Sequence, residues 1–288
     1  MKVAVIGGAG RMGNWLVQHF KMLGYDVVIS DVRLEEAKRT AERYGIKVSK
    51  TNVEAASNSE ITVISVPIRE TPLIIDQVKE KLKKGSILME ISSIKQHLTQ
   101  KLREVSSNGV NVLSLHPLFG PSVEKLRNKK LILVPISDAV QEEKFVRSLF
   151  PNMKIITLEA MEHDRLMAIT LSLTYFMNSV LADILSREDI TFLRRVGGTT
   201  FTLQLLISES IFAEDLSLLQ MLVLDNKFGL PFINKFVETS HEVVGWIREK
   251  DEASLRSFYE ETRKRLRKDP DFSESYNRLY EALSVISS

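Results

Sequence analysis

The sequence has no cysteine among its 288 residues, which excludes disulfides, thiolate metal ligands and cysteine nucleophiles. It also has little excess charge, because 39 lysines and arginines against 37 aspartates and glutamates leave a net charge of +2. This balance predicts no nucleic-acid partner and no membrane-binding surface. We find no apolar run approaching about 18 residues, and the chain opens on a short apolar strand rather than a signal peptide. We therefore expect a cytoplasmic protein that acts on a small molecule.

The first half of the chain alternates short apolar strands with amphipathic helices. We predict strands at residues 1–6, 25–30, 61–66, 86–91, 110–115, 130–134 and 154–158. The continuous β-branched run at 61–66 is typical of a strand buried inside a parallel sheet. Strands and helices that alternate in this way predict an α/β fold with a doubly wound parallel sheet.

The pattern changes near residue 159, after which helical periodicity dominates and no strand is predicted. We therefore predict two domains, an α/β domain at 1–158 and an all-helical domain at 159–288. The predicted helices between 166 and 224 are so apolar that a monomer would struggle to bury every face. This favours a homodimer formed through the helical domain. The alternative is one larger all-α core.

A glycine-rich turn follows the first predicted strand. Residues 7–13 read Gly-Gly-Ala-Gly-Arg-Met-Gly, and an amphipathic helix comes next. Strand, G-x-G-x-x-G turn and helix in this order predict a Rossmann-type dinucleotide-binding domain, although another α/β protein could also carry a glycine-rich turn. Gly8 would permit the tight turn, Gly10 the approach of a pyrophosphate, and Gly13 close packing of helix on strand. The predicted phosphate-binding residues are Gly8, Gly10, Arg11, Met12 and Gly13.

An acidic residue stands where a ribose-binding carboxylate is expected. The second predicted strand ends at Asp31, 23 residues after Gly8. A carboxylate at this distance holds a ribose 2′-hydroxyl and repels a 2′-phosphate, which favours NAD over NADP. Arg33 could offset part of that charge, so modest use of NADP remains open.

Three polar segments directly follow predicted strands, at the sheet edge where doubly wound folds bind ligands. The first would form a rigid turn beneath the nicotinamide side, the second carries two hydroxyls and a lysine, and the third holds a histidine followed by two prolines and a glycine. The residues of interest are Ser65, Val66, Pro67, Ser92, Ser93, Lys95, His116 and Pro117.

His116 is the candidate catalytic base. Removal of a hydride from a carbinol requires a base for the hydroxyl proton, and a neutral imidazole suits pH 7. Pro117 and Pro121 leave the loop little backbone freedom, so the ring would be held in a fixed place. Ser93 could orient or share the proton, although capping of a helix would equally explain a Ser-Ser pair. The spacing of the other histidines predicts no metal site.

Several segments together are similar to the prephenate/arogenate dehydrogenase family. Their order and spacing match over nearly the whole chain. The glycine turn is shared with many dehydrogenases, whereas the segments at 92–95 and 116–121 are more specific. The matching segments are residues 7–13, Ser-Val-Pro at 65–67, Ser-Ser-Ile-Lys at 92–95, His-Pro-Leu-Phe-Gly-Pro at 116–121 and Glu-His-Asp at 162–164.

The resemblance implies NAD-dependent oxidative decarboxylation of prephenate to 4-hydroxyphenylpyruvate, a step of tyrosine biosynthesis. Carried over, the base is His116, its hydroxyl partner is Ser93, and Lys95 and Pro117 help to shape the substrate pocket. The resemblance also implies a homodimer built through the helical domain.

The sequence departs from the family pattern at two substrate-side positions. Tyr175 stands where a histidine is usual, and Thr202, with Gln204 close by, stands where an arginine grips a substrate carboxylate. Either another cation, such as Arg165, Arg194 or Arg195, reaches the pocket, or the ligand differs. Two alternatives therefore stay open. One is a related NAD(P)-dependent reductase or dehydrogenase with a hydroxy-acid or imine substrate, and the other is an NAD-binding regulatory protein without turnover.

Overall fold

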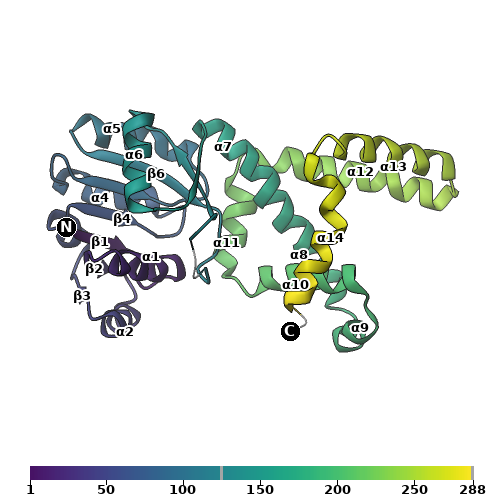
Figure 1. Cartoon of the computed structure of the whole chain (residues 1–288), viewed down its shortest axis with the longest axis horizontal. Helices are drawn as coiled ribbons and strands as arrows, with labels where there is room; N and C mark the ends of the chain where they lie inside the picture. Colours follow the sequence, from purple (N-terminus) through teal and green to yellow (C-terminus); the bar gives the residue numbers. More distant parts are fainter. Residues whose placement is uncertain (124–125, 287–288) are drawn as a thin grey trace. The chain divides into compact units, whose positions relative to one another are not determined.

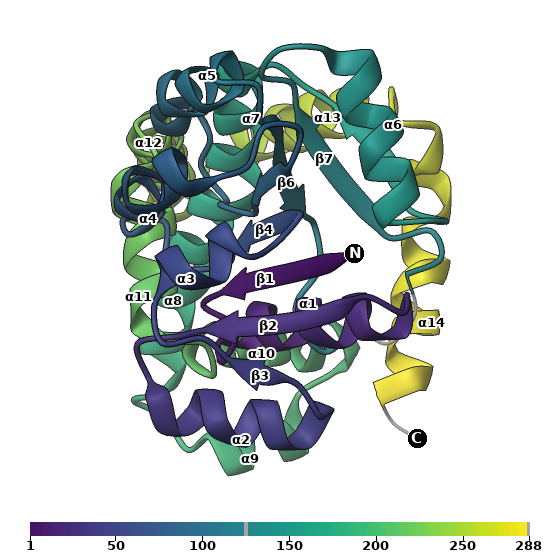
Figure 2. The ribbon, with the colours of Figure 1, turned by 90° about the vertical axis from the view of Figure 1, so that its left-hand side faces the viewer.

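Eight strands form one sheet in the order β3-β2-β1-β4-β5-β6-β7-β8, in which β1 lies between β2 and β4 (Figure 2). The computed structural model describes residues 1–123 and 126–286. The order of the strands reverses beside β1, which is the arrangement of a doubly wound fold. The strands are β1 (Lys2–Ile6), β2 (Asp26–Ser30), β3 (Lys47–Val48), β4 (Ile61–Ile64), β5 (Ile87–Glu90), β6 (Asn111–Pro117), β7 (Lys130–Val134) and β8 (Lys154–Thr157).

The sheet is mainly parallel, which confirms the predicted fold class, but β7 runs antiparallel to β6. The predicted parallel sheet therefore contains this one antiparallel pair. The described part of the link between the two strands, residues 118–123 and 126–129, contains no helix. Without a crossover helix the chain returns beside the strand that it has just left, and such neighbours pair antiparallel. The short strand β3 was also not predicted.

Helices cover both faces of the sheet because successive strand residues point to opposite sides. Val3 and Val5 pack with α1, α2 and α6, whereas Ile6 packs with α3, α4 and α5. The buried faces of these helices carry the apolar residues that the sequence places at helical spacing. The helices are α1 (Arg11–Met22), α2 (Leu34–Tyr44), α3 (Asn52–Ser57), α4 (Thr71–Val78), α5 (Thr99–Ser107) and α6 (Ala139–Leu149).

The glycine turn joins β1 to α1, and Gly7 rather than Gly8 is its left-handed residue, with a φ of +79°. A Cβ atom at Gly7 would lie 2.2 Å from the Ser65 carbonyl oxygen, so only glycine fits. Gly8 is restricted instead by the Ile29 side chain, 2.5 Å from its hypothetical Cβ. A Cβ at Gly13 would lie 2.0 Å from the Gly7 oxygen, which explains how α1 packs so close to the turn.

The chain divides into two compact units, Met1–Met167 and the residues from Ala168 onward (Figure 1). This division falls nine residues after the predicted boundary at 158/159, because α7 (Ala160–Met167) packs with the first unit. The second unit consists of helices, as predicted, with two π-helical segments, η3 and η4. Its elements are η3 (Ala168–Leu173), α8 (Thr174–Leu185), α9 (Ile190–Val196), α10 (Thr199–Phe212), α11 (Leu216–Gln220), η4 (Met221–Asp225), α12 (Gly229–Glu249), α13 (Glu252–Leu266), η5 (Pro270–Glu274) and α14 (Ser275–Ile286).

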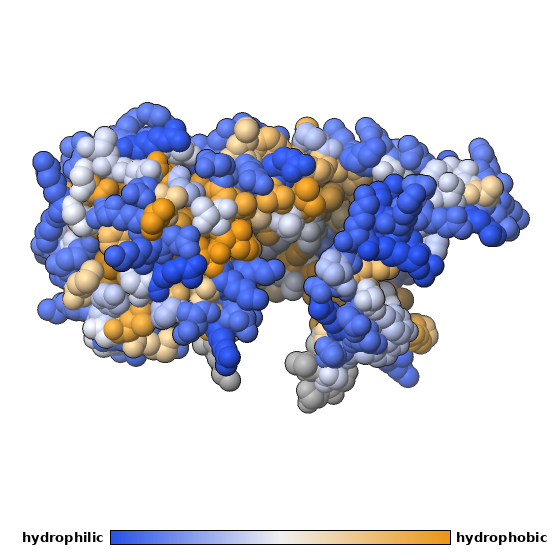
Figure 3. All heavy atoms as spheres, turned by 45° about the horizontal axis from the view of Figure 1, so that its top comes forward, coloured by the Kyte–Doolittle hydropathy of each residue, from blue (hydrophilic) through white to orange (hydrophobic). Residues whose placement is uncertain are grey.

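Many apolar side chains remain exposed on the second unit. On α8, Met177, Val180 and Ile184 are 38%, 45% and 56% exposed. Hydrophobic residues, shown in orange, are also visible among hydrophilic ones in Figure 3.

Within the described residues, the helical stretch Ala160–Leu185 is long and apolar enough to cross a membrane by length and composition. Two further segments, Leu216–Asp225 and Gly229–Glu249, are bent by 88° relative to each other and meet the same criterion only if they are counted as one span. Serine, threonine and asparagine interrupt the longer stretch, so no uninterrupted apolar run was apparent in the sequence. The core helices of water-soluble proteins often meet the same criteria.

Candidate active site

Adjacent strands bring three polar side chains to the carboxyl end of the sheet. β5 and β6 pair so that Glu90 lies opposite Ser114. Because residues two apart on a strand share a face, His116 lies on the same side as Ser114. Glu90, Ser114 and His116 are all buried. A cluster of buried polar groups at this edge requires hydrogen-bonding partners, and the chain supplies them.

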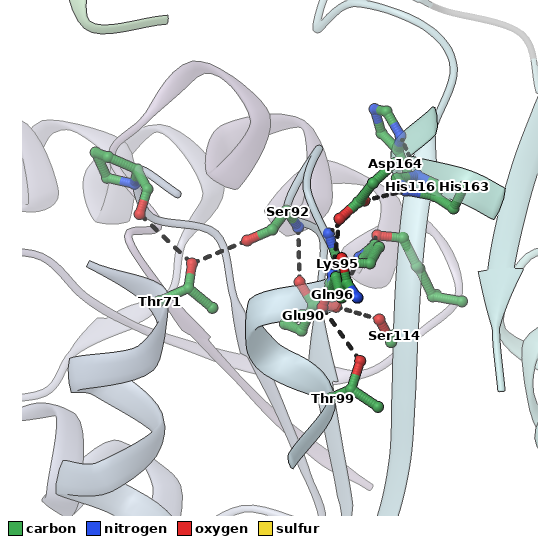
Figure 4. A network of polar contacts seen from close by, with 12 residues as sticks. Thr71, Glu90, Ser92, Lys95, Gln96, Thr99, Ser114, His116, His163 and Asp164 are labelled. Carbon is green, nitrogen blue, oxygen red and sulfur yellow. Dashed lines mark hydrogen bonds and ion pairs between the residues drawn. The ribbon is translucent and has the colours of Figure 1, made fainter. Parts of the chain in front are cut away.

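Lys95 lies at the centre of the cluster, and its side chain is fully buried (Figure 4). Its Nζ donates to Glu90 Oε1 and to the Leu115 carbonyl oxygen, each at 2.6 Å. Ser114 Oγ donates to the same carboxylate oxygen of Glu90. Burial lowers the pKa of Lys95, and the Glu90 carboxylate opposes this shift. Lys95 therefore shapes the site from within, because its ammonium group is engaged by protein oxygens.

His116 reaches the site from within β6 and not from a loop after it. The prediction placed the histidine beyond the strand, but β6 continues to Pro117 because His116 pairs with Ile132 of the antiparallel neighbour β7. The ring is thus fixed by strand pairing as well as by the proline that follows. Burial lowers the pKa of His116 well below its ordinary value, and the nearby His163 and Lys95 lower it further. The ring is therefore neutral at pH 7 and can accept a proton.

A chain of hydrogen bonds links His116 to a carboxylate on α7 (Figure 4). His116 Nδ1 lies 2.9 Å from His163 Nε2, and His163 Nδ1 lies 2.8 Å from Asp164 Oδ1. Asp164 also accepts the backbone N–H groups of Lys95 at 2.8 Å and Gln96 at 2.9 Å. Burial lowers the pKa of His163, and the hydrogen bond that its Nδ1 makes to the Asp164 carboxylate opposes this shift. Among the described residues, His116 Nε2 makes no hydrogen bond.

The two serines of the second predicted segment have different environments. Ser92 is buried, its Oγ lies 3.0 Å from Thr71 Oγ1, and its N–H donates to Glu90 Oε2. Its hydroxyl is therefore already hydrogen bonded within the fold. Ser93 is half-buried, and its hydroxyl makes no hydrogen bond to any residue in the described part of the chain. Of the two, Ser93 is the better placed to bind a ligand.

The first predicted segment lies against the glycine turn. The Ser65 carbonyl and the Val66 side chain are the atoms nearest to Gly7. Pro67 is exposed, and its carbonyl accepts the N–H of Thr71 at 3.2 Å. The end of β4 therefore borders the turn that the sequence assigns to a dinucleotide.

The glycine turn fits a dinucleotide phosphate. A Cβ at Gly10 would lie 3.2 Å from the Gly7 oxygen, so a larger residue would fill the approach to the turn. Helix α1 begins at Arg11, with no side-chain cap on Gly10. The N–H groups of the first turn, around Arg11 and Met12, then suit an anion.

Asp31 follows β2 directly and connects to the turn. Its Oδ2 accepts the Ala9 N–H at 3.0 Å, and its Oδ1 lies 3.3 Å from Arg33 Nε. The Asp31 carboxylate is nearly buried, whereas the Arg33 side chain is 52% exposed. The Asp31 carboxylate therefore stabilises the glycine turn, and Arg33 is its cationic partner at the predicted ribose position.

Other predicted substrate residues lie in the second unit. Tyr175 is half-buried on α8, and Thr202 on α10 donates to the Gly198 carbonyl at 3.1 Å. Arg194 forms an ion pair with Glu209, and Arg195 is exposed on α9. Arg165 is exposed on α7 in the first unit. Thr202 stands where an arginine is expected. Gln204, two residues later, donates a 2.6 Å hydrogen bond to Asn178 Oδ1.

Sequence reasoning missed some members of the site. Glu90 is the next-to-last residue of the predicted strand 86–91, and a charged residue inside an otherwise apolar strand was the available signal. His163 and Asp164 were noted as a motif, but a pairing with His116 across 47 positions has no local signature. Over residues 1–123 and 126–286, no group of three or more histidine, aspartate or glutamate side chains could hold a metal ion.

Comparison with known proteins agrees with the geometry. Residues 18–157 match the family model "Prephenate dehydrogenase, nucleotide-binding domain". A probable arogenate/prephenate dehydrogenase of Methanocaldococcus jannaschii is 30% identical over 181 residues, which are 61% of this chain and 40% of that protein. The T-protein of Haemophilus influenzae is 23% identical over 253 residues, 87% of this chain and 63% of the relative. The chain thus spans between about two fifths and two thirds of the length of these two relatives.

Solved structures share the fold. Prephenate dehydrogenase from A. aeolicus, in complex with hydroxyphenyl propionate and NAD⁺, has a TM-score of 0.75 at 18% identity and covers 93% of this chain and 98% of its own. Synechocystis arogenate dehydrogenase has a TM-score of 0.69 at 16% identity and covers 93% of this chain and 99% of its own. The sheet, the glycine turn and the polar edge define a Rossmann-type dinucleotide-binding unit followed by a helical unit. The sequence matches show that the chain is similar to prephenate/arogenate dehydrogenases, most clearly over residues 18–157.

Proposed function

We propose that the protein catalyses the NAD-dependent oxidative decarboxylation of prephenate to 4-hydroxyphenylpyruvate. The similarity to prephenate/arogenate dehydrogenases supports this reaction, and the A. aeolicus neighbour was solved with NAD⁺ and hydroxyphenyl propionate. The observation that carries the proposal is the neutral, buried His116, whose Nε2 is left without a hydrogen-bond partner among the described residues. The reaction removes a hydride from a carbon and a proton from the hydroxyl on that carbon. A base is therefore needed beside this hydroxyl.

The site residues would perform the proton transfers. When bound, NAD supplies the hydride acceptor. His116 Nε2 takes the proton of the ring hydroxyl, and the carbinol carbon becomes a carbonyl. The carboxylate on the quaternary ring carbon then leaves as carbon dioxide, and its bonding electron pair passes into the ring, which becomes a phenolate. His116 returns its proton to that phenolate, so the base is regenerated at the end of the turnover.

Other residues would orient the reactants. Ser93 would hydrogen bond to the reacting hydroxyl or to His116, because its own hydroxyl is unengaged within the described residues. Lys95 and Pro117 would support the pocket wall around His116, since the Lys95 ammonium is held by Glu90 and Leu115. Tyr175 and Thr202 would contribute polar contacts from the helical unit. An arginine outside the usual family position would then bind a substrate carboxylate.

The glycine turn would hold the pyrophosphate, and Asp31 would hold the adenosine ribose of NAD. Gly8, Gly10 and Gly13 keep the turn free of side chains, and Ser65, Val66 and Pro67 would border the nicotinamide side. Arg33 beside Asp31 leaves room for weaker use of NADP, since its guanidinium could pair with a 2′-phosphate. Arg33→Ala should therefore raise KM for NADP more than KM for NAD. An equal change in both constants would show that Arg33 does not face that position.

Two further parts of the proposal concern assembly. We expect residues 1–158 to act as the dinucleotide-binding domain and residues 159–288 as the substrate and dimerisation domain of a cytoplasmic homodimer. The exposed apolar side chains of α8 favour the dimer. An arogenate substrate and a related reductase activity are the competing possibilities, favoured by the absence of an arginine at Thr202.

An assay of NADH formation tests the proposed function. Purified protein would be supplied with NAD and either prephenate, arogenate or a simple 3-hydroxy acid. We expect turnover with prephenate and release of 4-hydroxyphenylpyruvate and carbon dioxide. Turnover only with arogenate would reassign the substrate, and turnover only with a 3-hydroxy acid would reassign the reaction. NAD binding without turnover on any of them would indicate a regulatory protein.

A further inference from the structure

We propose that His163 and Asp164 are positioning residues that hold His116 in one tautomer and share the proton that it takes up. This inference rests on the proposed function for its kinetic consequences, because it concerns the base of that reaction. The tautomer itself is a property of the free protein. The three groups form a continuous hydrogen-bonded line from β6 to α7 (Figure 4).

The direction of each hydrogen bond follows from the carboxylate at the end of the line. Asp164 accepts two backbone N–H groups, and an ionised carboxylate can only accept. His163 Nδ1 must then carry the hydrogen that it donates to Asp164. A neutral His163 has a lone pair on Nε2, so this atom accepts a hydrogen from His116 Nδ1. His116 is left with its lone pair on Nε2, the atom that has no protein partner within the described residues.

The opposite tautomer would disrupt the line at a buried position. A hydrogen on His116 Nε2 would leave Nδ1 facing His163 Nε2 with a lone pair on each atom. His163 would then have to move its hydrogen away from Asp164, and the carboxylate would lose one of its donors. Both rings are buried, so neither group can turn to water for compensation. The carboxylate thus selects the tautomer in which His116 can act as a base.

The same line offers a place for the proton during turnover. When Nε2 of His116 gains the hydroxyl proton, the hydrogen on Nδ1 can pass 2.9 Å to His163 Nε2. The positive charge then lies on the ring that contacts Asp164 directly and has moved away from the reacting carbon. No net proton is gained or lost, and the transfer reverses when the phenolate recovers its proton.

Besides the Asp164 carboxylate at its end, three other groups set the electrostatic environment of this line. Glu90 on β5 and Asp164 on α7 are anionic, and Lys95 beside them is cationic. His97, in the segment that follows Lys95, is the other ring near these carboxylates. Lys95 is neutralised by Glu90 at 2.6 Å, which leaves the Asp164 charge as the direct counterion of the two rings.

The tautomer can be measured by ¹⁵N NMR of the imidazole nitrogens in the full-length protein without substrate. We expect His116 Nε2 to lack a hydrogen in the unaltered protein and to carry one in a substantial fraction of Asp164→Asn molecules. Glu162→Gln is the matched control, since it removes the same charge from an exposed neighbouring position on α7. It should leave the tautomer unchanged. A hydrogen on Nε2 of the unaltered protein, or an unchanged tautomer in Asp164→Asn, would overturn the proposal.

A second variant separates the two roles. In His163→Gln the side-chain oxygen can still accept the hydrogen of His116 Nδ1, but it cannot take a proton at neutral pH. We expect the His116 tautomer to persist and kcat to fall by about 10-fold or more. An unaltered kcat in His163→Gln would contradict the sharing of the proton. This variant also keeps the proposal testable if Asp164→Asn fails to fold.

The pH profile distinguishes positioning from mere structural support. Asp164→Asn should lower kcat by about 10²–10⁴-fold, as loss of the orienting aspartate does in serine proteases. Because Asp164 raises the pKa of His163, its removal should also move the acidic limb of kcat/KM to lower pH. A lower rate with an unmoved limb would indicate a structural role and overturn the proposal. If the unaltered protein shows no turnover with any substrate, the proposed function fails, whereas the NMR result still decides the tautomer.

Discussion

The two units of the chain differ in which side chains they bury. The first unit buries charged and imidazole groups, whereas large apolar residues are exposed more densely on the second unit than on the first. Burial of polar groups costs free energy unless the groups are paired, so a buried network that leaves His116 Nε2 without a partner among the described residues indicates chemistry. Exposed apolar side chains indicate association instead. The contrast supports the proposed proton transfer in the first unit and the proposed dimerisation through the second. The buried groups are Glu90, Lys95, His116, His163 and Asp164, and the exposed residues include Met177, Val180, Ile184, Phe192, Val196, Ile207 and Phe212.

The largest effect is expected at the reacting atom of the first unit. His116→Asn should lower kcat by about 10²–10⁴-fold, because an amide cannot take the hydroxyl proton. The dissociation constant for NAD should stay within a few-fold, since the glycine turn is unchanged. Steady-state kinetics and fluorescence titration with NAD measure the two quantities. A near-normal kcat would show that the first unit holds its base elsewhere.

Ion pairs provide the next comparison. Lys95→Met would leave the Glu90 carboxylate buried without its cation and should lower the free energy of unfolding by about 3–5 kcal/mol. Arg187→Met in the second unit breaks the exposed pair with Asp183 and should cost about 0–1 kcal/mol. Denaturant unfolding of both variants measures the difference.

A double variant then tests the cause of the larger loss. Glu90→Gln added to Lys95→Met removes the unpaired charge, so part of the stability should return. Equal losses in the double and the single variant would show that packing, and not the uncompensated charge, dominates at this site.

The exposed apolar face of the second unit should control assembly. Ile184 on α8 is 56% exposed, and Ile184→Lys would place a charge on that face. We expect sedimentation to show a dimer for the unaltered protein and a large loss of dimer for this variant. Val140→Lys changes an apolar residue of the first unit that is 82% exposed, and it should leave the dimer intact. A monomeric unaltered protein would refute the assignment.

Much of the fold could be predicted from local sequence patterns. The alternation that places Val3 and Val5 on one face and Ile6 on the other is a property of neighbouring residues, and so is the glycine turn. The antiparallel direction of β7 was not predictable from composition. It depends on the link between β6 and β7, whose described residues contain no helix. That return also kept His116 inside a strand.

The candidate site could be predicted only in part. His116 and Ser93 stand out because polar residues directly after apolar strands are unusual. The partners His163 and Asp164 come from a helix that follows the last strand, and only tertiary packing brings them to β6. The requirement for glycine at position 7 likewise depends on the Ser65 carbonyl, which follows a different strand, β4.

The smallest expected effect is a difference in acid sensitivity between the two units. Burial is the main cause that lowers the pKa of His19, His97, His116 and His163, all of which lie in the first unit. Each ring gains a proton more readily once unfolded, so the stability that these rings contribute is complete above about pH 6.5 and is lost as the pH falls toward the lowered values. The fifth histidine, His241, is exposed on α12.

Hydrogen exchange at pH 7.5 and pH 5.5, corrected for the intrinsic effect of pH, should therefore show greater loss of protection in the first unit. His19 offers a direct control, because its Nε2 lies 2.7 Å from the Leu149 carbonyl and its ring stacks on Trp15 and Phe150. In His19→Gln the amide can still donate to that carbonyl but takes no proton, so part of the acid sensitivity should disappear. Equal loss of protection in both units would mean that they unfold together, and the contrast in burial would then have no separate consequence for stability.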